Sequence, residues 1–425
     1  MEIFNNPERS RWASICRRPV QNDPGLEARV REILELVRTK GDGALKVLSQ
    51  KFDGVVLSEI KVSEAEIEAA KELVSDDVKA AIEQAYSNIY AFHKAEMPKR
   101  IEKQTAHGVI CIQKPVPVKN IGLYIPGGTA PLFSTVLMLA VPAQIAGCSR
   151  RILCTPCRKD GSVSPEVLYS ASRCGITEIF KVGGAQAIAA MAYGTATVPS
   201  VDKIFGPGNR YVMEAKKVVS GEGTSIDMPA GPSEVMVLAD ETANPAYVAA
   251  DLLSQAEHGR DSQVLLVCTD VKVAEAALAE VKRQAALLPR FELVESALSY
   301  SRAVVFESPD DIVEFADAYA PEHLIISMKD ADGIAERVQC AGSVFIGNFS
   351  PESAGDYASG TNHTLPTSGW ARSCSGVNID SFTRKMTLQK LSRDGLAGLA
   401  GTIVAMAEAE GLQAHANAVK VRMNE

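Results

Sequence analysis

The sequence predicts an α/β fold with two parallel-sheet domains. Its 425 residues exceed what one hydrophobic core usually supports, so we expect at least two domains. From residue 120 onwards, short apolar runs alternate with helical patterns, as in repeated strand–helix–strand units. Glycine-rich loops follow three of the predicted strands, at Tyr124-Ile-Pro-Gly-Gly, Gly183-Gly-Ala-Gln and Gly206-Pro-Gly-Asn. In parallel sheets, ligands bind beyond the carboxyl ends of the strands, where such loops lie.

The first 120 residues are predicted to be mostly helical. Residues 1–23 are polar and irregular, and we expect an extended arm or a helix packed on another surface. Residues 25–52 carry apolar side chains at helical spacing, and residues 63–95 form a second helical region. Residues 99–118 alternate between apolar and polar side chains and end near proline, which indicates β-structure.

Two strand–helix series follow. The predicted strands of the first are 121–126, 151–155, 178–182 and 202–205, with helices that begin near 131, 165, 187 and 211. The predicted strands of the second are 235–239, 263–268, 303–306, 324–327 and 343–346, with a helix at 271–287. The Gly- and Ser-rich segment 350–376 is too polar to be core. The tail carries a helix that stops at Gly411 and a short second one around His415.

Composition excludes several classes of protein. A hydrophobic content of 46% and a charged content of 23% are typical of a soluble globular chain. The net charge of −8 gives no reason to expect nucleic acid as a partner, and no apolar run is long enough to span a membrane. No secretory signal is visible, and nine scattered cysteines favour a reducing cytoplasm. We interpret Cys154 and Cys157 as structural thiols rather than a redox pair.

A predicted helix between Asn244 and Gly259 carries the first candidate ligands. Gln255 and His258, spaced i,i+3, project close together at its end, as half of a metal site or as a hydrogen-bonded helix end. His323, His363 and His415 stand in polar contexts, and Asp356 lies seven residues before His363. Such nitrogen and oxygen donors suit Zn²⁺, although no spacing excludes solvated loop histidines.

Glu322 and His323 are candidates for acid/base chemistry. An imidazole titrates near neutrality, and an adjacent carboxylate could activate water. The alternative is a capping glutamate beside a histidine at a strand end. The glycine loops could cradle phosphate groups, but none matches G-x-G-x-x-G, so they support at most a degenerate nucleotide site. Ser233 lacks a G-x-S-x-G elbow, which argues against serine hydrolase chemistry.

Long motifs spread over nearly the whole chain resemble the histidinol dehydrogenase family. In chain order, these motifs are Gly122-Leu-Tyr-Ile-Pro-Gly-Gly, Val182-Gly-Gly-Ala-Gln-Ala-Ile-Ala-Ala, Lys203-Ile-Phe-Gly-Pro-Gly-Asn, Ile226-Asp-Met-Pro-Ala-Gly-Pro-Ser-Glu, Asp251-Leu-Leu-Ser-Gln-Ala-Glu-His-Gly, Ala320-Pro-Glu-His-Leu, Gly360-Thr-Asn-His-Thr-Leu-Pro-Thr and Glu408-Ala-Glu-Gly-Leu-Gln-Ala-His. Their number and order make the resemblance specific. Residues 1–20 carry little of it.

The resemblance implies a zinc- and NAD-dependent enzyme that oxidises L-histidinol to L-histidine through L-histidinal, the last steps of histidine biosynthesis. By matching motifs, one Zn²⁺ per subunit would be bound by Gln255, His258, Asp356 and His415. His323 would be the general base of both oxidations, and Glu322 would activate water. Histidinol would contact Ser233, His363 and Glu410 in addition to the ligand residues and His323. NAD would contact Tyr124, Gln186 and Asn209.

The resemblance also implies an architecture and an assembly. We expect two incomplete, Rossmann-like domains, one formed by residues 24–120 with 234–377 and carrying the metal and acid/base residues. The other, residues 121–233, would lie on the NAD side. Residues 1–23 would be an N-terminal arm, and residues 378–425 a helical domain that reaches the partner in a homodimer with shared active sites.

Other functions remain open from the residues themselves. The nearest is a paralogous zinc- and NAD-dependent dehydrogenase of another small alcohol. A metallohydrolase that uses Glu322 and metal-bound water without NAD is a second, and a non-catalytic binding module is a third.

Overall fold

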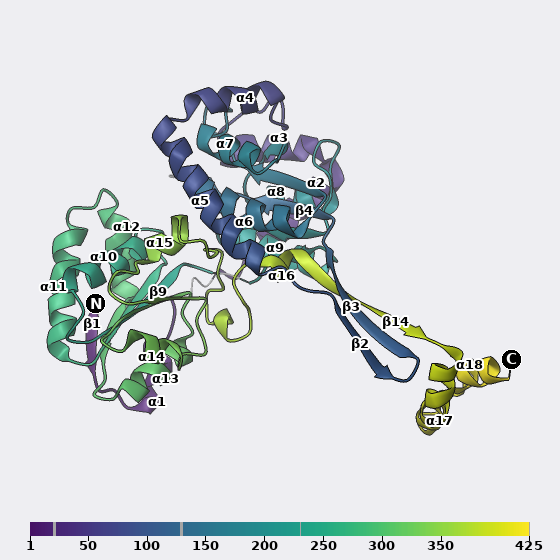
Figure 1. Cartoon of the computed structure of the whole chain (residues 1–425). Helices are drawn as coiled ribbons and strands as arrows, with labels where there is room; N and C mark the ends of the chain where they lie inside the picture. The colour runs from purple at the N-terminus through teal and green to yellow at the C-terminus, as the bar shows by residue number, and fades with distance from the viewer. Residues whose placement is uncertain (20–22, 128–130, 230, 425) are drawn as a thin grey trace.

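The computed structural model describes residues 1–19, 23–127, 131–229 and 231–424. Two α/β bodies lie side by side, and a narrow antiparallel arm extends from one of them to a helical hairpin at the C-terminus (Figure 1). Gly128 of the first predicted glycine loop and Ala230 of the Asp227–Glu234 motif lie outside the described residues. Among the described helices, none is both long and apolar enough to cross a membrane.

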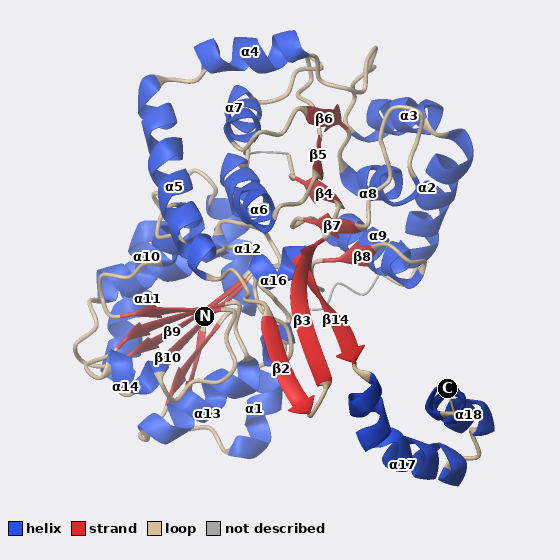
Figure 2. Cartoon of the chain, turned by 45° about the vertical axis from the view of Figure 1, so that its right-hand side comes forward, coloured by secondary structure: helices blue, strands red, loops and turns tan. Residues whose placement is uncertain are grey.

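A parallel sheet of five strands forms the centre of the first body. Its order is β6-β5-β4-β7-β8. The strands are β4 (Asn120–Tyr124), β5 (Arg150–Thr155), β6 (Glu178–Lys181), β7 (Lys203–Phe205) and β8 (Ser225–Ile226). The register partners Leu123, Leu153 and Phe205 are buried on one face, and Ile152 and Ile204 are buried on the other, so the sheet is covered on both faces (Figure 2).

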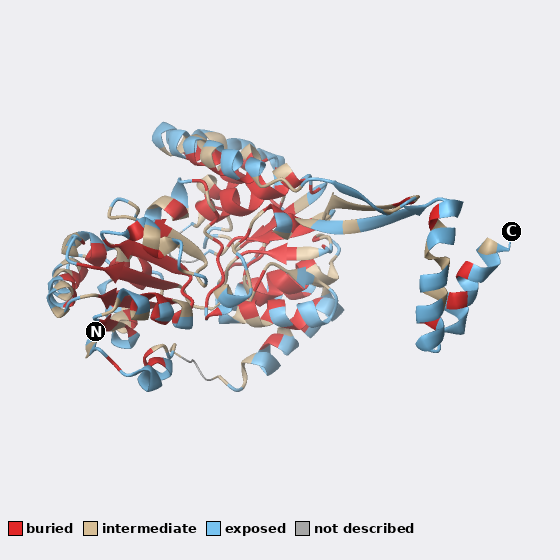
Figure 3. Cartoon of the chain, turned by 60° about the horizontal axis from the view of Figure 1, so that its bottom comes forward, coloured by how far each residue is buried: buried red, intermediate tan, exposed pale blue. Residues whose placement is uncertain are grey.

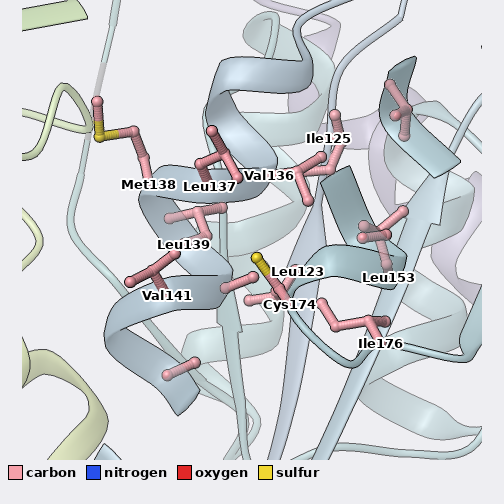
Figure 4. Close-up of a cluster of buried hydrophobic side chains, with 14 of the residues drawn as sticks. Leu123, Ile125, Val136, Leu137, Met138, Leu139, Val141, Leu153, Cys174 and Ile176 are labelled. Atoms are coloured by element: carbon pink, nitrogen blue, oxygen red, sulfur yellow. The ribbon is translucent and has the colours of Figure 1, made fainter. Parts of the chain in front are cut away.

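Helices cover both faces of this sheet. Helix α6 (Phe133–Ala146) is apolar almost all round, and its side chains between Val136 and Val141 are buried against the sheet and α5 (Asp76–Ala95) (Figure 4). Each large side chain buried there contributes about 1.5–3 kcal/mol. The same face carries α7 (Pro165–Arg173) and the opposite face α8 (Gly184–Tyr193) and α9 (Arg210–Gly221).

The N-terminal helices belong to this first body. They are α2 (Leu26–Lys40), α3 (Asp42–Phe52), α4 (Glu64–Leu73) and α5 (Asp76–Ala95). Val30, Leu34 and Val37 of α2 pack with α8, while Ile82 and Ile89 of α5 pack with α6. The expected grouping of residues 24–120 with residues 234–377 is therefore not how these helices pack. An apolar stripe fixes which side of a helix is buried, but not which of two sheets buries it.

The second body contains a parallel sheet of six strands. Its order is β1-β11-β10-β9-β12-β13. The strands are β1 (Glu2–Asn5), β9 (Glu234–Ala239), β10 (Gln263–Cys268), β11 (Arg302–Val305), β12 (His323–Ser327) and β13 (Ser343–Ile346). Helices α10 (Pro245–Ala256), α11 (Val271–Ala285) and α12 (Phe291–Tyr300) cover one face; α1 (Arg9–Ile15), α13 (Pro309–Tyr319) and α14 (Ala331–Ala335) cover the other.

The first residues are not a detached arm. Strand β1 pairs with β11, and Trp12 of α1 packs edge-on against Phe306 and Phe315 at ring-centroid distances of 5.3 and 5.4 Å. Of the two alternatives expected for residues 1–23, α1 confirms the helix packed on another surface, and a short edge strand and one anchoring indole tie the segment to the second sheet.

The antiparallel arm combines residues far apart in the sequence. Strands β2 (Ile101–Ala106) and β3 (Val109–Pro117) form a hairpin, to which β14 (Thr383–Leu391) adds along its whole length. The sequence analysis did not predict β14. Short helix α16 (Ile379–Phe382) anchors the base of the arm, because Phe382 stacks on Phe205 at 4.1 Å.

The arm ends in the C-terminal hairpin, formed by α17 (Arg393–Ala409) and α18 (Gln413–Met423). Both predicted helices are confirmed, and Gly411, with φ of +75°, follows the end of the first as expected. The hairpin stands clear of both bodies and is mostly exposed (Figure 3). Met406, Leu412 and Val421 expose apolar surface, which is typical of a region that is covered in an assembly.

Candidate active site

A cavity of about 600 Å³ lies where the two bodies meet. The first body supplies the loop Gly206-Pro-Gly-Asn-Arg, which follows the carboxyl end of β7. The second supplies groups at the amino ends of its strands: Ser233 before β9 and Glu322 before β12. His258, which follows α10, and His363 complete the lining. The parallel register explains this convergence, because β9 and β12 are neighbours with His323 paired to Val235, so their amino ends lie next to each other.

The backbone of Glu234 aligns three of the predicted site residues. Its N–H donates to Oε2 of Glu322 at 2.8 Å. Its carbonyl accepts hydrogen bonds from Nε2 of Gln255 and Nδ1 of His323, both at 3.2 Å. The backbone of Glu234, the first residue of β9, therefore fixes the side chains of Gln255, Glu322 and His323 relative to one another.

His323 is held as a neutral base. Burial lowers the pKa of its imidazole to about 3, so the ring is uncharged at neutral pH. Because Nδ1–H donates to the Glu234 carbonyl, Nε2 carries the free lone pair. Nε2 is buried without a hydrogen-bond partner and lies 3.8 Å from Oδ1 of Asp356. The free lone pair on Nε2 of His323 and the carboxylate of Asp356 therefore face the same space.

A buried carboxylate that the sequence analysis missed faces this space. Glu352, at the start of α15 (Glu352–Tyr357), is 0% exposed, and neither of its carboxylate oxygens has a hydrogen-bond partner. Donor atoms of His258, Glu352 and Asp356 all lie within 4.8 Å of one another. The i,i+4 spacing of Glu352 and Asp356 on one short helix was the available signal.

The unsatisfied atoms fit a cation. Oε1 of Gln255, Nε2 of His323 and both carboxylate oxygens of Glu352 are buried acceptors with no partner. Burying such groups without compensation is costly, and the donor set of imidazole, carboxylate and amide oxygen suits Zn²⁺. Burial raises the pKa of Asp356 to about 6 and those of Glu322 and Glu352 well above their usual range. A bound cation would favour the charged forms of these groups.

His363 joins the two bodies at the cavity. Its Nδ1 lies 2.9 Å from the backbone oxygen of Asp356, and its Nε2 lies 3.3 Å from Oγ1 of Thr135 on α6. Burial lowers the pKa of this imidazole to about 4. Ser233 lines the same cavity. Both residues therefore line the same cavity as Glu322.

The three residues predicted to contact NAD occupy the glycine loops. Asn209 lines the cavity and caps α9, its side-chain oxygen accepting from the N–H groups of Tyr211 and Val212. Tyr124 ends β4, and its hydroxyl accepts from the N–H of Gly184 at 3.1 Å. Gln186 is buried in the first turn of α8. Tyr124 and Gln186 are not among the described residues that line the cavity.

Two predicted site residues lie elsewhere in this chain. Glu410 and His415 are exposed on the C-terminal hairpin, at the far end of the antiparallel arm (Figure 1). Within the described ranges, the cluster of potential metal donors contains His258, Glu352 and Asp356 but not His415. The fold of one subunit thus gathers most of the predicted site and leaves these two residues outside it.

The two cysteines of Cys154-Thr-Pro-Cys157 are both free. Burial raises the pKa of each thiol above its ordinary value, which disfavours a reactive thiolate. Cys154 lies within β5 and Cys157 in the loop that follows it.

Comparison with known proteins decides the family. A sequence model described as histidinol dehydrogenase matches residues 16–423. The chain belongs to the histidinol dehydrogenase family. The histidinol dehydrogenase of Bacteroides thetaiotaomicron is 52% identical over 424 residues, which cover 100% of this chain and 99% of that protein. That of Vibrio parahaemolyticus is 52% identical over 413 residues, which cover 96% and 95%.

The solved structures agree. The crystal structure of histidinol dehydrogenase from Elizabethkingia anophelis superposes with a TM-score of 0.97 at 50% identity, covering 100% of this chain and 98% of that one. The predicted α/β fold with parallel sheets and a helical C-terminal region is therefore confirmed. As a histidinol dehydrogenase family member, the chain is an oxidoreductase, and the family's place is in histidine biosynthesis.

Proposed function

We propose that this chain oxidises L-histidinol to L-histidine through L-histidinal, with zinc and two molecules of NAD⁺, in the last steps of histidine biosynthesis. The observation that carries the proposal is the set of buried, unpartnered acceptors on Gln255, His323 and Glu352, which lie next to Glu322 and His258 of the cavity lining. Together they describe a site that binds a cation next to a base. Family membership supplies the substrate.

Zinc would be held by Gln255, His258 and Asp356, with His415 as the fourth donor. When bound, it supplies positive charge that grips the imidazole and amine of the substrate, a template role. Glu352 adds a carboxylate to the same cluster. Ser233, His363 and Glu410 are the proposed further contacts of histidinol.

His323 is the proposed base of both oxidations. In the first, Nε2 accepts the hydroxyl proton of the alcohol while the carbon-bound hydrogen leaves with its electron pair. NAD⁺ supplies the hydride acceptor, held by Tyr124, Gln186 and Asn209. In the second, the same nitrogen accepts a hydroxyl proton from the hydrated aldehyde. The hydrogen bond from Nδ1 to Glu234 keeps this nitrogen free for each transfer.

Glu322 is the proposed activator of water. Its carboxyl group borders the cavity and is fixed by the Glu234 N–H. The group removes a proton from water as the oxygen adds to the aldehyde carbon. Because water is consumed only when histidinal is hydrated, the proposed role of Glu322 is confined to that step, whereas His323 acts in both oxidations.

The proposed active unit is a cytoplasmic homodimer. Glu410 and His415 lie beyond reach of the site in their own chain, while the exposed apolar residues of the hairpin favour burial against a second subunit. Each hairpin would then supply these two residues to the partner's cavity. Residues 378–425 would be the exchanged element.

A steady-state assay with purified protein tests the proposal. With zinc, NAD⁺ and histidinol, we expect two molecules of NADH for each molecule of histidine formed. No NADH from histidinol, with turnover of another small alcohol, would favour a paralogous dehydrogenase instead. Product formation without NAD⁺ would favour a hydrolase. As a control for the cofactor site, Asn209→Ala should raise the KM for NAD⁺ more than that for histidinol.

A further inference from the structure

Arg18 lies at the end of the N-terminal segment and contacts the residue that organises the site. Its Nη2 donates to Oε2 of Glu234 at 2.8 Å, and its Nε donates to the other carboxylate oxygen. The Glu234 side chain is 3% exposed and that of Arg18 20%, so this forked pair is largely shielded from water. The only other hydrogen bond described for that carboxylate comes from the N–H of Ser368.

The same guanidinium holds the turn that leads into the acid/base pair. Nη2 also donates to the carbonyl of Tyr319 at 2.8 Å, and the group lies 4.0 Å over the Tyr319 ring. The next residue, Ala320, has φ of +53°, a left-handed conformation that costs energy for a residue with a side chain. Only Pro321 separates this residue from Glu322.

Arg18 thus touches both strand ends that define the site. On one side is the start of β9, where the Glu234 backbone binds Glu322, Gln255 and His323. On the other, its contacts are with the carbonyls of Tyr319 and Ala320, in the turn that precedes the start of β12 at His323. Because one planar guanidinium group binds both the Glu234 carboxylate and the 319–320 turn, it fixes the position of the turn relative to the start of β9.

We propose that Arg18 is a positioning residue that holds Glu322 and His323 in register with Glu234. This inference rests on the proposed roles of Glu322 and His323. Arg18 itself does not line the cavity among the described residues, so it acts through Glu234 and the 319–320 turn. Loss of the fork leaves a buried carboxylate without its cation, and the strand end must shift to reach water or another donor.

Kinetics of Arg18→Met provide the first test. Misplacement of reacting groups by about 1 Å can cost about 10²-fold in rate, and we expect a loss of that order in kcat. The KM for NAD⁺ should stay within about twofold of wild type, because the glycine loops lie in the other body. The matched control is Arg9→Met in the same segment, since the described contacts of Arg9 are with Asp311 and Glu314 at the surface and with the Trp12 ring, and none is with a residue of the site.

Two further variants keep the test decisive. Arg18→Lys retains the charge without the fork, so it should fold like wild type and lose about tenfold in kcat, less than the methionine variant. Glu234→Gln removes the other partner. If the two act as one unit, the double variant Arg18→Met/Glu234→Gln should be no slower than the slower single variant. Multiplied losses in the double variant would contradict the proposal, as would an unchanged kcat in folded Arg18→Met.

An activity-independent measurement separates this inference from the proposed function. The chain has six histidines, so selective ¹⁵N labelling of histidine gives a sparse spectrum in which His323→Ala assigns the His323 ring. Arg18→Met should shift the ring nitrogen signals of His323, and Arg9→Met should not. Unshifted signals would overturn the positioning role. Absence of NADH from the wild-type protein would instead overturn the proposed function and leave the spectral test standing.

Discussion

The acid/base region and the C-terminal hairpin hold their chemical groups in opposite ways. Glu322, His323 and Gln255 are buried and bound to one backbone residue, Glu234, so their geometry exists before any ligand arrives. Glu410 and His415 are exposed on two helices at the end of a narrow arm. The first region obtains its order from the fold of one subunit, and we propose that the second obtains it from assembly.

This difference has a physical basis. A parallel sheet with helices on both faces can desolvate groups and lock them, which is why the pKa of His323 falls to about 3. An arm of three strands has no such layers, and the Glu410 and His415 side chains reach solvent. We therefore expect changes in the preorganised acid/base region to affect mainly the rates of the chemical steps. Changes in the hairpin should affect mainly the affinity for the metal.

The largest expected effect comes from the preorganised region. His323→Ala should lower the rate of both oxidations by about 10² to 10⁴-fold, because positioned proton transfer is typically worth that much. The measurement is NADH formation from histidinol and, separately, from histidinal. A loss confined to one of the two substrates would contradict a single shared base.

The hairpin should show its effect in metal binding. His415→Ala should weaken zinc affinity by about 10²-fold or more, since loss of a mere supporting contact already costs 10- to 100-fold. Competition with a chromogenic chelator measures it. Gln413→Ala, at an exposed position of the same helix, is the control and should bind zinc like wild type. Equal affinity in both variants would place His415 outside the site.

Glu322→Gln sharpens the comparison within the preorganised region. The change keeps the shape of the side chain but removes its basicity, so oxidation of histidinal should slow by about 10²-fold while that of histidinol changes less. Single-turnover rates with each substrate separate the two steps. Equal slowing of both would mean that Glu322 acts on a step other than hydration.

The smallest expected effect concerns stability against acid. The pKa of His363 is about 4 in the folded protein against 6.5 for an ordinary histidine, so the unfolded chain takes up a proton first. Stability present above pH 6.5 is lost as the pH falls towards 4. In chelator-treated protein, His363→Gln should reduce the drop in Tm between pH 7 and pH 5 by about 2–4 °C. An unaltered slope would assign the acid sensitivity to other groups.

Much of the fold could be predicted from the sequence. The strands of both sheets other than β1 and β8, and the two C-terminal helices, follow from apolar runs, helical spacing and Gly411. Strand β14 could not, because its residues are mostly exposed and its partner β3 lies more than 250 positions earlier in the sequence. The packing of α2–α5 on the first sheet could not be predicted either, because the apolar stripe of a helix does not indicate which sheet covers it.

The site divides in the same manner. His323, in a long motif, and Asp356, seven residues before His363, were predicted as site residues and lie together. Glu352 was missed because an isolated glutamate near a helix start usually faces solvent, and only the structure reveals that it is buried without a partner. Arg18 was missed because its partner Glu234 is 216 residues away. Long-range contacts of this kind leave no local pattern.

We propose that each active site combines buried groups of one subunit with Glu410 and His415 of the other. Mixing of subunits tests this arrangement most directly. His258→Ala and His415→Ala each should be inactive alone. After unfolding and refolding together, half of the dimers are hybrids with one intact site each, so about a quarter of wild-type activity should return. Activity no greater than the sum of the two parents would contradict shared sites and require His415 to act within its own chain.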